Sequence, residues 1–274
     1  EDVYVSVLDD GLDIAHEDLA ANVVENGSWN FLSGTADPSG YDWYVDGDSH
    51  GTSVAGIIGA VGWNDIGVRG VAPEVQLKGI NLLSSYTDLN EISALGFESY
   101  SADSDIFNLS YGLETVYASV IAATTEDALW YGVANLRDGK GAIYIQSAGN
   151  GFQTFNDYST GQQASCSDAN ENGLSCQNTA MDPSFVHPAI IGVAALDASG
   201  LAASYSTAGA ANWIAAPGGE FGQHLSYFGE GDGEPGIMTT DSSGCSSGYV
   251  WSGSPLSVNA FDDKGNHSGN ADCN

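Results

Sequence analysis

Positively charged residues are scarce in this sequence. The 274-residue chain has five lysines and arginines against 36 aspartates and glutamates, which gives a formal net charge of −31 at pH 7. A surface this acidic repels nucleic acids and anionic membranes, so we expect neither as a partner. It is typical of a protein adapted to salt or to life outside the cell, and it attracts basic peptides and metal cations. Long apolar runs are also absent: no stretch of about 18 apolar residues occurs, so no membrane-spanning helix is expected.

Cysteines are few, and they are not spaced as zinc ligands. The chain has four of them and no Cys-x-x-Cys motif, which disfavours zinc. They form two close pairs in polar sequence, Cys166 with Cys176 and Cys245 with Cys273, and this spacing predicts two local disulfides. Disulfides require an oxidising compartment, so we expect a secreted, extracellular protein. No signal peptide is visible, because the first residues already enter a strand.

Hydrophobic residues make up 42% of the chain, enough for the core of one large α/β domain. Strand-like apolar runs alternate with helical ones, which predicts a mostly parallel sheet between layers of helices. One helix begins with the N-cap candidate Thr87 and places Leu89, Ile92 and Leu95 on one face. The polar stretch 152–182 is expected to be a long loop closed by the first cysteine pair. The predicted strands are 3–9, 75–83, 105–112, 141–150, 189–196 and 212–218, and the predicted helices are 50–62, 87–100 and 125–137.

Three polar residues fall where functional groups gather in such a sheet. Asp9 ends an apolar strand, His50 opens the helix HGTSVAGIIG, and Asn150 closes SAGN after another strand. Singly, they have ordinary explanations: a turn or helix cap, a core histidine, and a turn before Gly151. Together they predict that Asp9 accepts the Nδ1 proton of His50 and leaves Nε2 as a general base, a contact that also compensates for burying the carboxylate. A glycosidase built on Asp9 and Asp10 is disfavoured, because adjacent strand residues point to opposite faces.

Several longer motifs follow one another along the chain: VSVLDDGLDIAHEDL, GSWNF, DSHGTSVAGIIGA, GVRGVAP, NLSYG, KGAIYIQSAGNG and IMTTD. In this order they resemble the subtilisin-like serine endopeptidases, and most of all the bacterial-type, secreted members of the kexin and furin branch. The resemblance implies an α/β, subtilisin-like three-layer fold with a mostly parallel sheet between helices. It also implies a subtilase catalytic domain over residues 1–274 and hydrolysis of peptide bonds by an Asp-His-Ser triad.

The resemblance assigns roles to the residues singled out above. Asp9 corresponds to the triad carboxylate, His50 to the triad base and Asn150 to the side-chain donor of the oxyanion hole. The segment that resembles the family's edge strand, which pairs with the substrate backbone, consists of Ser110, Tyr111 and Gly112.

Three acidic residues bear on substrate choice. Asp10 resembles the acid that meets a basic side chain next to the cleaved bond in the kexin branch; the alternative is a solvated turn acid. Asp48, Glu114 and the overall charge favour basic residues near the cut. Strict dibasic cleavage is not expected, because Thr115 in SYGLET stands where that branch carries an acid.

A calcium site is also implied by the resemblance, since an all-oxygen ligand set suits Ca²⁺. Without the resemblance, its one carboxylate, Asp18, would be an ordinary helix-start acid. The implied ligands are the Asp18 and Asn64 side chains and the carbonyls of Ile66 and Val68, with Val61 or Gly62 as a further contact.

The sequence lacks the family's nucleophile motif. No Gly-Thr-Ser follows Asn150: Ser53 belongs to the histidine motif, and Ser252 and Ser254 in WSGSPLS do not have the required order. We therefore expect the nucleophile beyond Asn274, on a missing or separate segment of a domain that also lacks its leading segment. A propeptide or chaperone is a further partner in this interpretation, and a β-sandwich domain could follow. The alternative is a non-catalytic subtilase-fold binding module.

Overall fold

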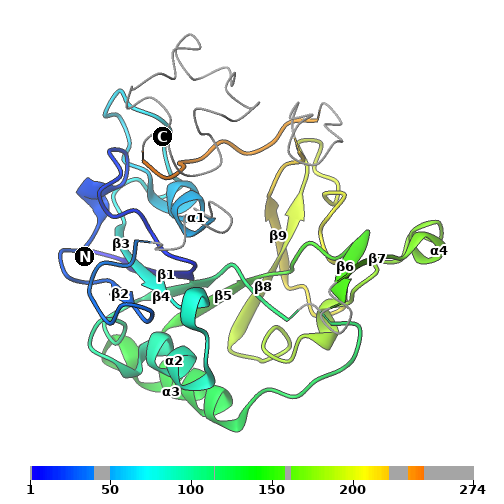
Figure 1. Cartoon of the computed structure of the whole chain (residues 1–274), viewed down its shortest axis with the longest axis horizontal. Coiled ribbons are helices and arrows are strands. Elements are labelled where there is room, and N and C mark those ends of the chain that lie inside the picture. Colours follow the sequence, from blue (N-terminus) through cyan, green and yellow to red (C-terminus); the bar gives the residue numbers. More distant parts are fainter. Residues whose placement is uncertain (1, 40–49, 114, 158–161, 222–233, 244–274) are drawn as a thin grey trace. The chain divides into compact units, whose positions relative to one another are not determined.

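The computed structural model describes residues 2–39, 50–113, 115–157, 162–221 and 234–243 (Figure 1). These residues fall into two compact units. The first unit holds 2–39, 50–108, 131–142 and 238–243, and the second holds 109–113, 115–130, 143–157, 162–221 and 234–237. Within these ranges no helix has both the length and the hydrophobicity needed to cross a membrane.

The first unit is built on parallel strands. Its strands follow the order β2 (Trp29–Asn30), β3 (Gln76–Asn81), β1 (Tyr4–Asp9) and β4 (Ile106–Leu109), of which only the last residue of β4 is assigned to the second unit. Strand β1 pairs in parallel with β3 from Tyr4 opposite Gln76 to Asp9 opposite Asn81. The last five residues of β1 are all buried, as expected for a short apolar run in a sheet covered on both faces. This register places Asp9 at the carboxyl end of a buried strand.

Helix α1 (His50–Gly59) lies close to this sheet because its buried positions are small. Gly51, Ala55, Gly56 and Gly59 are among them. Gly51 is required at its position: a Cβ there would collide with the carbonyl oxygen of Gly11, next to the end of β1. The core around α1 consists of Val5, Val7, Leu12, Leu19, Ala55, Ala60, Val75 and Leu77.

The helix predicted over 87–100 is interrupted. Thr87 is its N-cap, since its side chain accepts the Asn90 N–H at 3.1 Å, but α2 (Asp88–Ile92) gives way to the π-helical turn η3 (Ser93–Phe97). The expected apolar face is wrong at Leu89, which is 71% exposed, whereas Leu95 is buried. Leu89 stands in the first turn of α2, and the regular helical spacing assumed for the face ends at Ile92.

Helix α3 (Ala123–Gly139) matches the predicted 125–137 and loses helical dihedrals from Leu136 onward, before the expected stop at DGKG. Among the described residues, short 3₁₀ turns occur at η1 (Ala20–Asn22), η2 (Leu83–Ser85) and η4 (Thr179–Met181).

The second unit contains a parallel sheet and a small hairpin. Strands β5 (Ile143–Ser147), β8 (Ile190–Leu196) and β9 (Ile214–Pro217) pair in parallel in this order. The expectation of an irregular loop over 152–182 is wrong. The segment contains the antiparallel hairpin β6 (Thr154–Asp157) and β7 (Gln162–Ser165), then the short helix α4 (Ser167–Asn170). The hairpin has no apolar alternation in its sequence, so backbone pairing alone reveals it.

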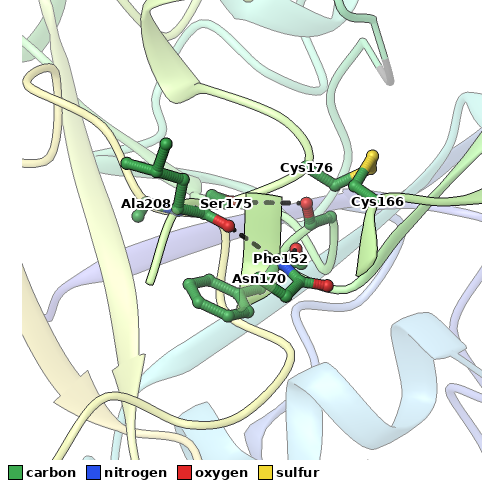
Figure 2. The surroundings of a disulfide bond; sticks show 8 residues. Phe152, Cys166, Asn170, Ser175, Cys176 and Ala208 are labelled. Carbon is green, nitrogen blue, oxygen red and sulfur yellow. Dashed lines mark hydrogen bonds between the residues drawn. A yellow bond between two sulfur atoms is a disulfide. The ribbon is translucent and has the colours of Figure 1, made fainter. Parts of the chain in front are cut away.

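The disulfide Cys166–Cys176 is confirmed, with a Cα–Cα distance of 5.3 Å (Figure 2). The Asn170 side-chain amide donates to the Phe152 carbonyl at 2.8 Å, and so does the Cys176 N–H at 2.8 Å. The bridge therefore closes a loop whose base is bonded to the chain near residue 152. The second predicted pair, Cys245 with Cys273, lies outside the described residues.

Candidate active site

The predicted contact between Asp9 and His50 is present in the first unit. Asp9 Oδ1 lies 2.8 Å from His50 Nδ1; the aspartate is fully buried, and the histidine side chain is 47% exposed. This contact suits the tautomer in which Nδ1–H donates to the carboxylate oxygen. This tautomer leaves Nε2 as the basic nitrogen, which is the arrangement a general base needs.

Hydroxyl contacts hold the first turn of α1 against neighbouring segments. Thr52 Oγ1 accepts the Asp13 N–H at 3.0 Å, and its carbonyl accepts the Thr240 hydroxyl at 2.7 Å. The Ser53 hydroxyl donates to the Thr240 carbonyl at 2.8 Å. His50 is therefore presented by a helix end that is bonded on both sides, and Ser53 serves as part of that support.

Asp10 also contacts α1, through the backbone. Its Oδ1 accepts the Gly51 N–H at 2.8 Å, and its Oδ2 accepts the His50 N–H at 3.2 Å. Burial, together with the neighbouring Asp9 carboxylate, raises the pKa of Asp10 to about 6, and the Gly51 N–H partly opposes that rise. The two adjacent acids thus engage different parts of one histidine.

The second unit brings Ser110, Tyr111, Gly112 and Asn150 together around one pocket of about 200 Å³. Buried polar atoms reach its wall: Gln177 Nε2 and Thr179 Oγ1 have no hydrogen-bond partner within the described residues. The pocket can therefore hold a polar group. Its other lining residues are Leu113, Thr115, Ser147, Ala148, Gly149, Asn178, Asp182, Phe185 and Thr207.

Asn150 is exposed, and both of its neighbours are bonded to Thr207. The Gly149 carbonyl accepts the Thr207 N–H at 3.0 Å, and the Gly151 N–H donates to Thr207 Oγ1 at 2.8 Å. The Gly151 carbonyl in turn accepts the Ser175 hydroxyl at 3.3 Å, from the loop that the disulfide closes. The backbone on either side of the Asn150 amide is thereby fixed.

Asp182 is a site residue that sequence reasoning missed. Its Oδ2 accepts the Leu113 N–H at 2.9 Å and the Gln146 Nε2–H at 3.3 Å, and the same Gln146 nitrogen donates to the Tyr111 carbonyl at 3.0 Å. Asp182 Oδ1 accepts the Ser184 N–H at 2.9 Å. The Asp-Pro-Ser sequence signals that Asx turn, but not the contact with a segment 69 residues away.

The residues of the expected calcium site lie together. Asp18 is fully buried; its Oδ1 accepts the Asn64 side-chain N–H at 2.7 Å and its Oδ2 accepts the Val68 N–H at 2.8 Å. The Val61 N–H donates to the Asp18 carbonyl at 2.8 Å, and the Ile66 N–H donates to Asn64 Oδ1 at 3.3 Å. In the part of the chain that the structure describes, no three His, Cys, Asp or Glu side chains form a metal cluster. A calcium ion here would depend on one carboxylate, one amide and backbone oxygens.

Two acids expected to favour basic substrates, and the two serines rejected as the nucleophile, lie outside the described residues. They are Asp48, Glu114, Ser252 and Ser254.

Comparison with known proteins identifies the family. The model of the Subtilase family matches residues 1–255 of the chain. An extracellular serine protease of Aeromonas sobria is 39% identical over 253 residues, which is 90% of this chain and 38% of that protein. A dibasic-processing endoprotease of Schizosaccharomyces pombe is 37% identical over 156 residues, which is 55% of this chain and 21% of that protein. The chain belongs to the subtilase family, a family of serine proteases.

A solved structure shows the same fold. The crystal structure of the Aeromonas sobria serine protease in complex with a chaperone matches with a TM-score of 0.75 at 36% identity. The match covers 90% of this chain and 39% of that one. The expected subtilisin-like α/β fold is thereby confirmed, and this chain spans less than half the length of these relatives.

Proposed function

We propose that this chain carries the base and the oxyanion donor of a secreted serine endopeptidase. The observation that carries the proposal is the 2.8 Å contact between buried Asp9 and the imidazole of His50. Burying a carboxylate without a partner raises the free energy of the folded state by several kcal/mol.

In the proposed reaction, a serine hydroxyl attacks the peptide carbonyl while His50 Nε2 takes its proton. Asp9 keeps the imidazole oriented and stabilises the imidazolium. The Asn150 side-chain amide donates to the oxyanion, and His50 then returns the proton to the leaving amine. Water, activated by the same histidine, hydrolyses the acyl-enzyme. The serine is proposed to lie beyond Asn274, because no Gly-Thr-Ser follows Asn150 in the sequence.

The substrate is proposed to be a peptide with basic residues near the cleaved bond. The backbone of Ser110–Gly112 would pair with it as an added strand. The polar pocket next to that segment, with Asp182 in its wall, supports a polar or basic side chain there. Asp48, Glu114 and the net charge of −31 add attraction for cations. The name of the dibasic-processing relative is consistent with this preference.

Calcium is proposed to bind at Asp18. The carboxylate of Asp18 and the amide oxygen of Asn64 are ligands of the kind Ca²⁺ prefers, and rotation of the Asn64 amide would present Oδ1 to Asp18 in place of Nδ2. When bound, the ion would supply positive charge to the buried Asp18 carboxylate and tie 61–68 to the chain at that residue.

Secretion and a folding partner are proposed from the relatives. The Aeromonas sobria relative is described as extracellular, and its structure contains a chaperone. The disulfide Cys166–Cys176 is consistent with an oxidising compartment.

The proposal is tested by cleavage of a peptide library. We expect the intact protein to cut peptides and the His50→Ala variant to be inactive. The control is the surface variant Asp37→Asn, which should keep full activity. The Asp37 carboxylate accepts the Ser39 N–H at 3.0 Å. Intact protein that binds peptides without cleaving them would instead favour a non-catalytic subtilase-fold module. A profile without preference for Arg or Lys near the cut would refute the basic preference alone.

A further inference from the structure

The disulfide Cys166–Cys176 is attached to the chain directly after Asn150. The residue that follows the bridge, Gln177, donates its N–H to the Gly151 carbonyl at 2.8 Å. We propose that this disulfide is a positioning element of the site: it holds Gln177 against Gly151 and thereby fixes the Asn150 amide next to them. This inference rests on the proposed function, in which that amide donates to the oxyanion.

Further contacts join both ends of the bridge to the same stretch of chain. The Cys176 N–H donates to the Phe152 carbonyl at 2.8 Å, and the Asn170 side-chain amide, from inside the closed loop, donates to the same carbonyl at 2.8 Å (Figure 2). At the other end of the bridge, the Cys166 N–H donates to the Gln153 carbonyl at 3.3 Å. The bridge and the loop that it closes therefore hold three successive residues after the proposed oxyanion donor.

Gln177 connects the bridge to the pocket. Its side chain is buried and lines the pocket together with Asn150. A Cβ at Gly151 would collide with Gln177 Oε1, so the glutamine side chain lies directly against the Gly151 backbone. The Gly151 N–H is bonded on its other side to Thr207 Oγ1 at 2.8 Å. A displacement of Gln177 would therefore free one side of Gly151 and move a wall of the pocket.

The loop has no hydrophobic anchor that could replace the bridge. Between 152 and 176, none of the side chains that the structure describes is both apolar and buried, and α4 has no buried residue. Leu174, inside the loop, is 62% exposed. Hydrogen bonds in an exposed segment with few apolar contacts open easily, and a cross-link restricts the conformations that the opened loop can adopt. Because the bridge lies outside the core, its loss should loosen this loop and leave the second unit folded.

Kinetics of the double variant Cys166→Ser with Cys176→Ser separate positioning from ordinary stabilisation. A bridge that only stabilises the fold lowers the thermal midpoint and leaves the kcat of folded protein unchanged. For the intact protein well below that midpoint, we expect kcat to fall roughly tenfold and KM to change by a smaller factor, because a displaced oxyanion donor acts mainly on the transition state.

The matched control for the double variant lies in the same loop. Asn172→Ala removes a bond from the Asn172 side chain to the Asp168 carbonyl at 2.7 Å and should match wild type. An unchanged kcat in the folded double variant, or an equal loss in the control, would overturn the proposal.

The Asn150→Ala variant shows whether the bridge acts through the amide. Without the amide, the bridge no longer has an oxyanion donor to position. Adding the double serine change to Asn150→Ala should therefore alter kcat by less than about twofold. Two losses that multiply would show that the bridge acts independently of Asn150 and would overturn the proposal.

Hydrogen exchange gives a readout that does not depend on peptidase activity. In the intact protein, exchange followed by mass spectrometry should be faster in the double serine variant for the peptides that cover 151–153 and 176–178, and unchanged for the peptide that covers β1. Asn172→Ala should leave all three peptides unchanged. Equal exchange in wild type and the double variant would contradict the positioning role even if the protein cleaves no peptide. Faster exchange in a protein without peptidase activity would keep the contact between the bridge and 151–153 and refute the proposed function.

Discussion

The two units differ in the kind of polar group that each places at its candidate site. The first unit buries a carboxylate and joins it to a half-exposed imidazole, so its key contact is between two ionisable side chains. The second unit lines its pocket mainly with amides, hydroxyls and backbone, and it fixes the exposed Asn150 through its neighbours' bonds to Thr207. An ionisable group depends on burial and on its partner for its protonation state, whereas an amide donor needs only a fixed direction. Substitutions in the first unit should therefore change chemistry by orders of magnitude, and those in the second unit by smaller factors.

The largest effect is expected from Asp9→Asn. The amide would favour the wrong tautomer of His50, and kcat should fall by roughly 10⁴-fold, a magnitude taken from serine-protease triads in general. The matched control lies at the other end of β1, where Asp105 accepts the Tyr4 N–H at 2.9 Å and pairs with Arg137. Asp105→Asn should lower the thermal midpoint while the folded protein keeps its kcat. Equal activity losses in the two variants would show that Asp9 is only structural.

Calcium removal should affect stability in the first unit. Chelation by EDTA should lower the thermal midpoint of wild type, because a ligand present at 100 times its Kd stabilises the folded state by about 2.7 kcal/mol. Asp18→Asn should start from a lower midpoint and respond little to EDTA, whereas Asp37→Asn should respond like wild type. A midpoint of wild type that does not change with added calcium would refute the site.

A smaller effect is expected in the second unit from Thr207→Val. The substitution keeps the shape of this buried side chain but removes the acceptor of the Gly151 N–H, so the Asn150 amide should lose its fixed direction. We expect kcat to fall roughly tenfold with KM nearly unchanged. Thr207→Ser keeps the hydroxyl and should retain most of the activity. If serine and valine variants behave alike, the hydroxyl contact does not position Asn150.

The smallest effect concerns pH and the stability of the first unit. The pKa of Asp10 is raised from 3.8 to about 6 by burial and by Asp9, and the charged groups facing it are Asp9 and His50. The protonated Asp10 carboxyl therefore stabilises the folded state. This contribution is fully present below the pKa of Asp10 in the unfolded chain and is lost as the pH rises through about 6. Asp10→Asn removes this titration. The difference in unfolding free energy, variant minus wild type, should therefore increase as the pH rises from about 4 to about 7. Denaturant unfolding at several pH values measures the difference, which should stay constant for Asp37→Asn.

The parts of the fold that carry strong local patterns could be predicted from sequence. The apolar run before Asp9 and the small residues after His50 define β1 and α1, and their contact follows from the order of elements in a parallel sheet. The polar hairpin β6–β7 and the π turn after Ile92 have no such pattern.

Contacts between distant segments of the site are harder to predict from sequence. Asp10 looks like a turn or substrate acid in sequence, because its bonds to His50 and Gly51 exist only once α1 packs on β1. Asp182 reaches Leu113 across 69 residues, so its Asx turn was the only local signal. Both residues act through tertiary contacts that no spacing rule contains.

The most direct test of the central claim is labelling of the intact protein with a serine-reactive fluorophosphonate, followed by mapping of the modified peptide by mass spectrometry. We predict one labelled serine, beyond Asn274, with labelling lost in His50→Ala and retained in Asp37→Asn. Absence of labelling in wild type, or labelling that persists without the His50 imidazole, would contradict a peptidase built on Asp9 and His50.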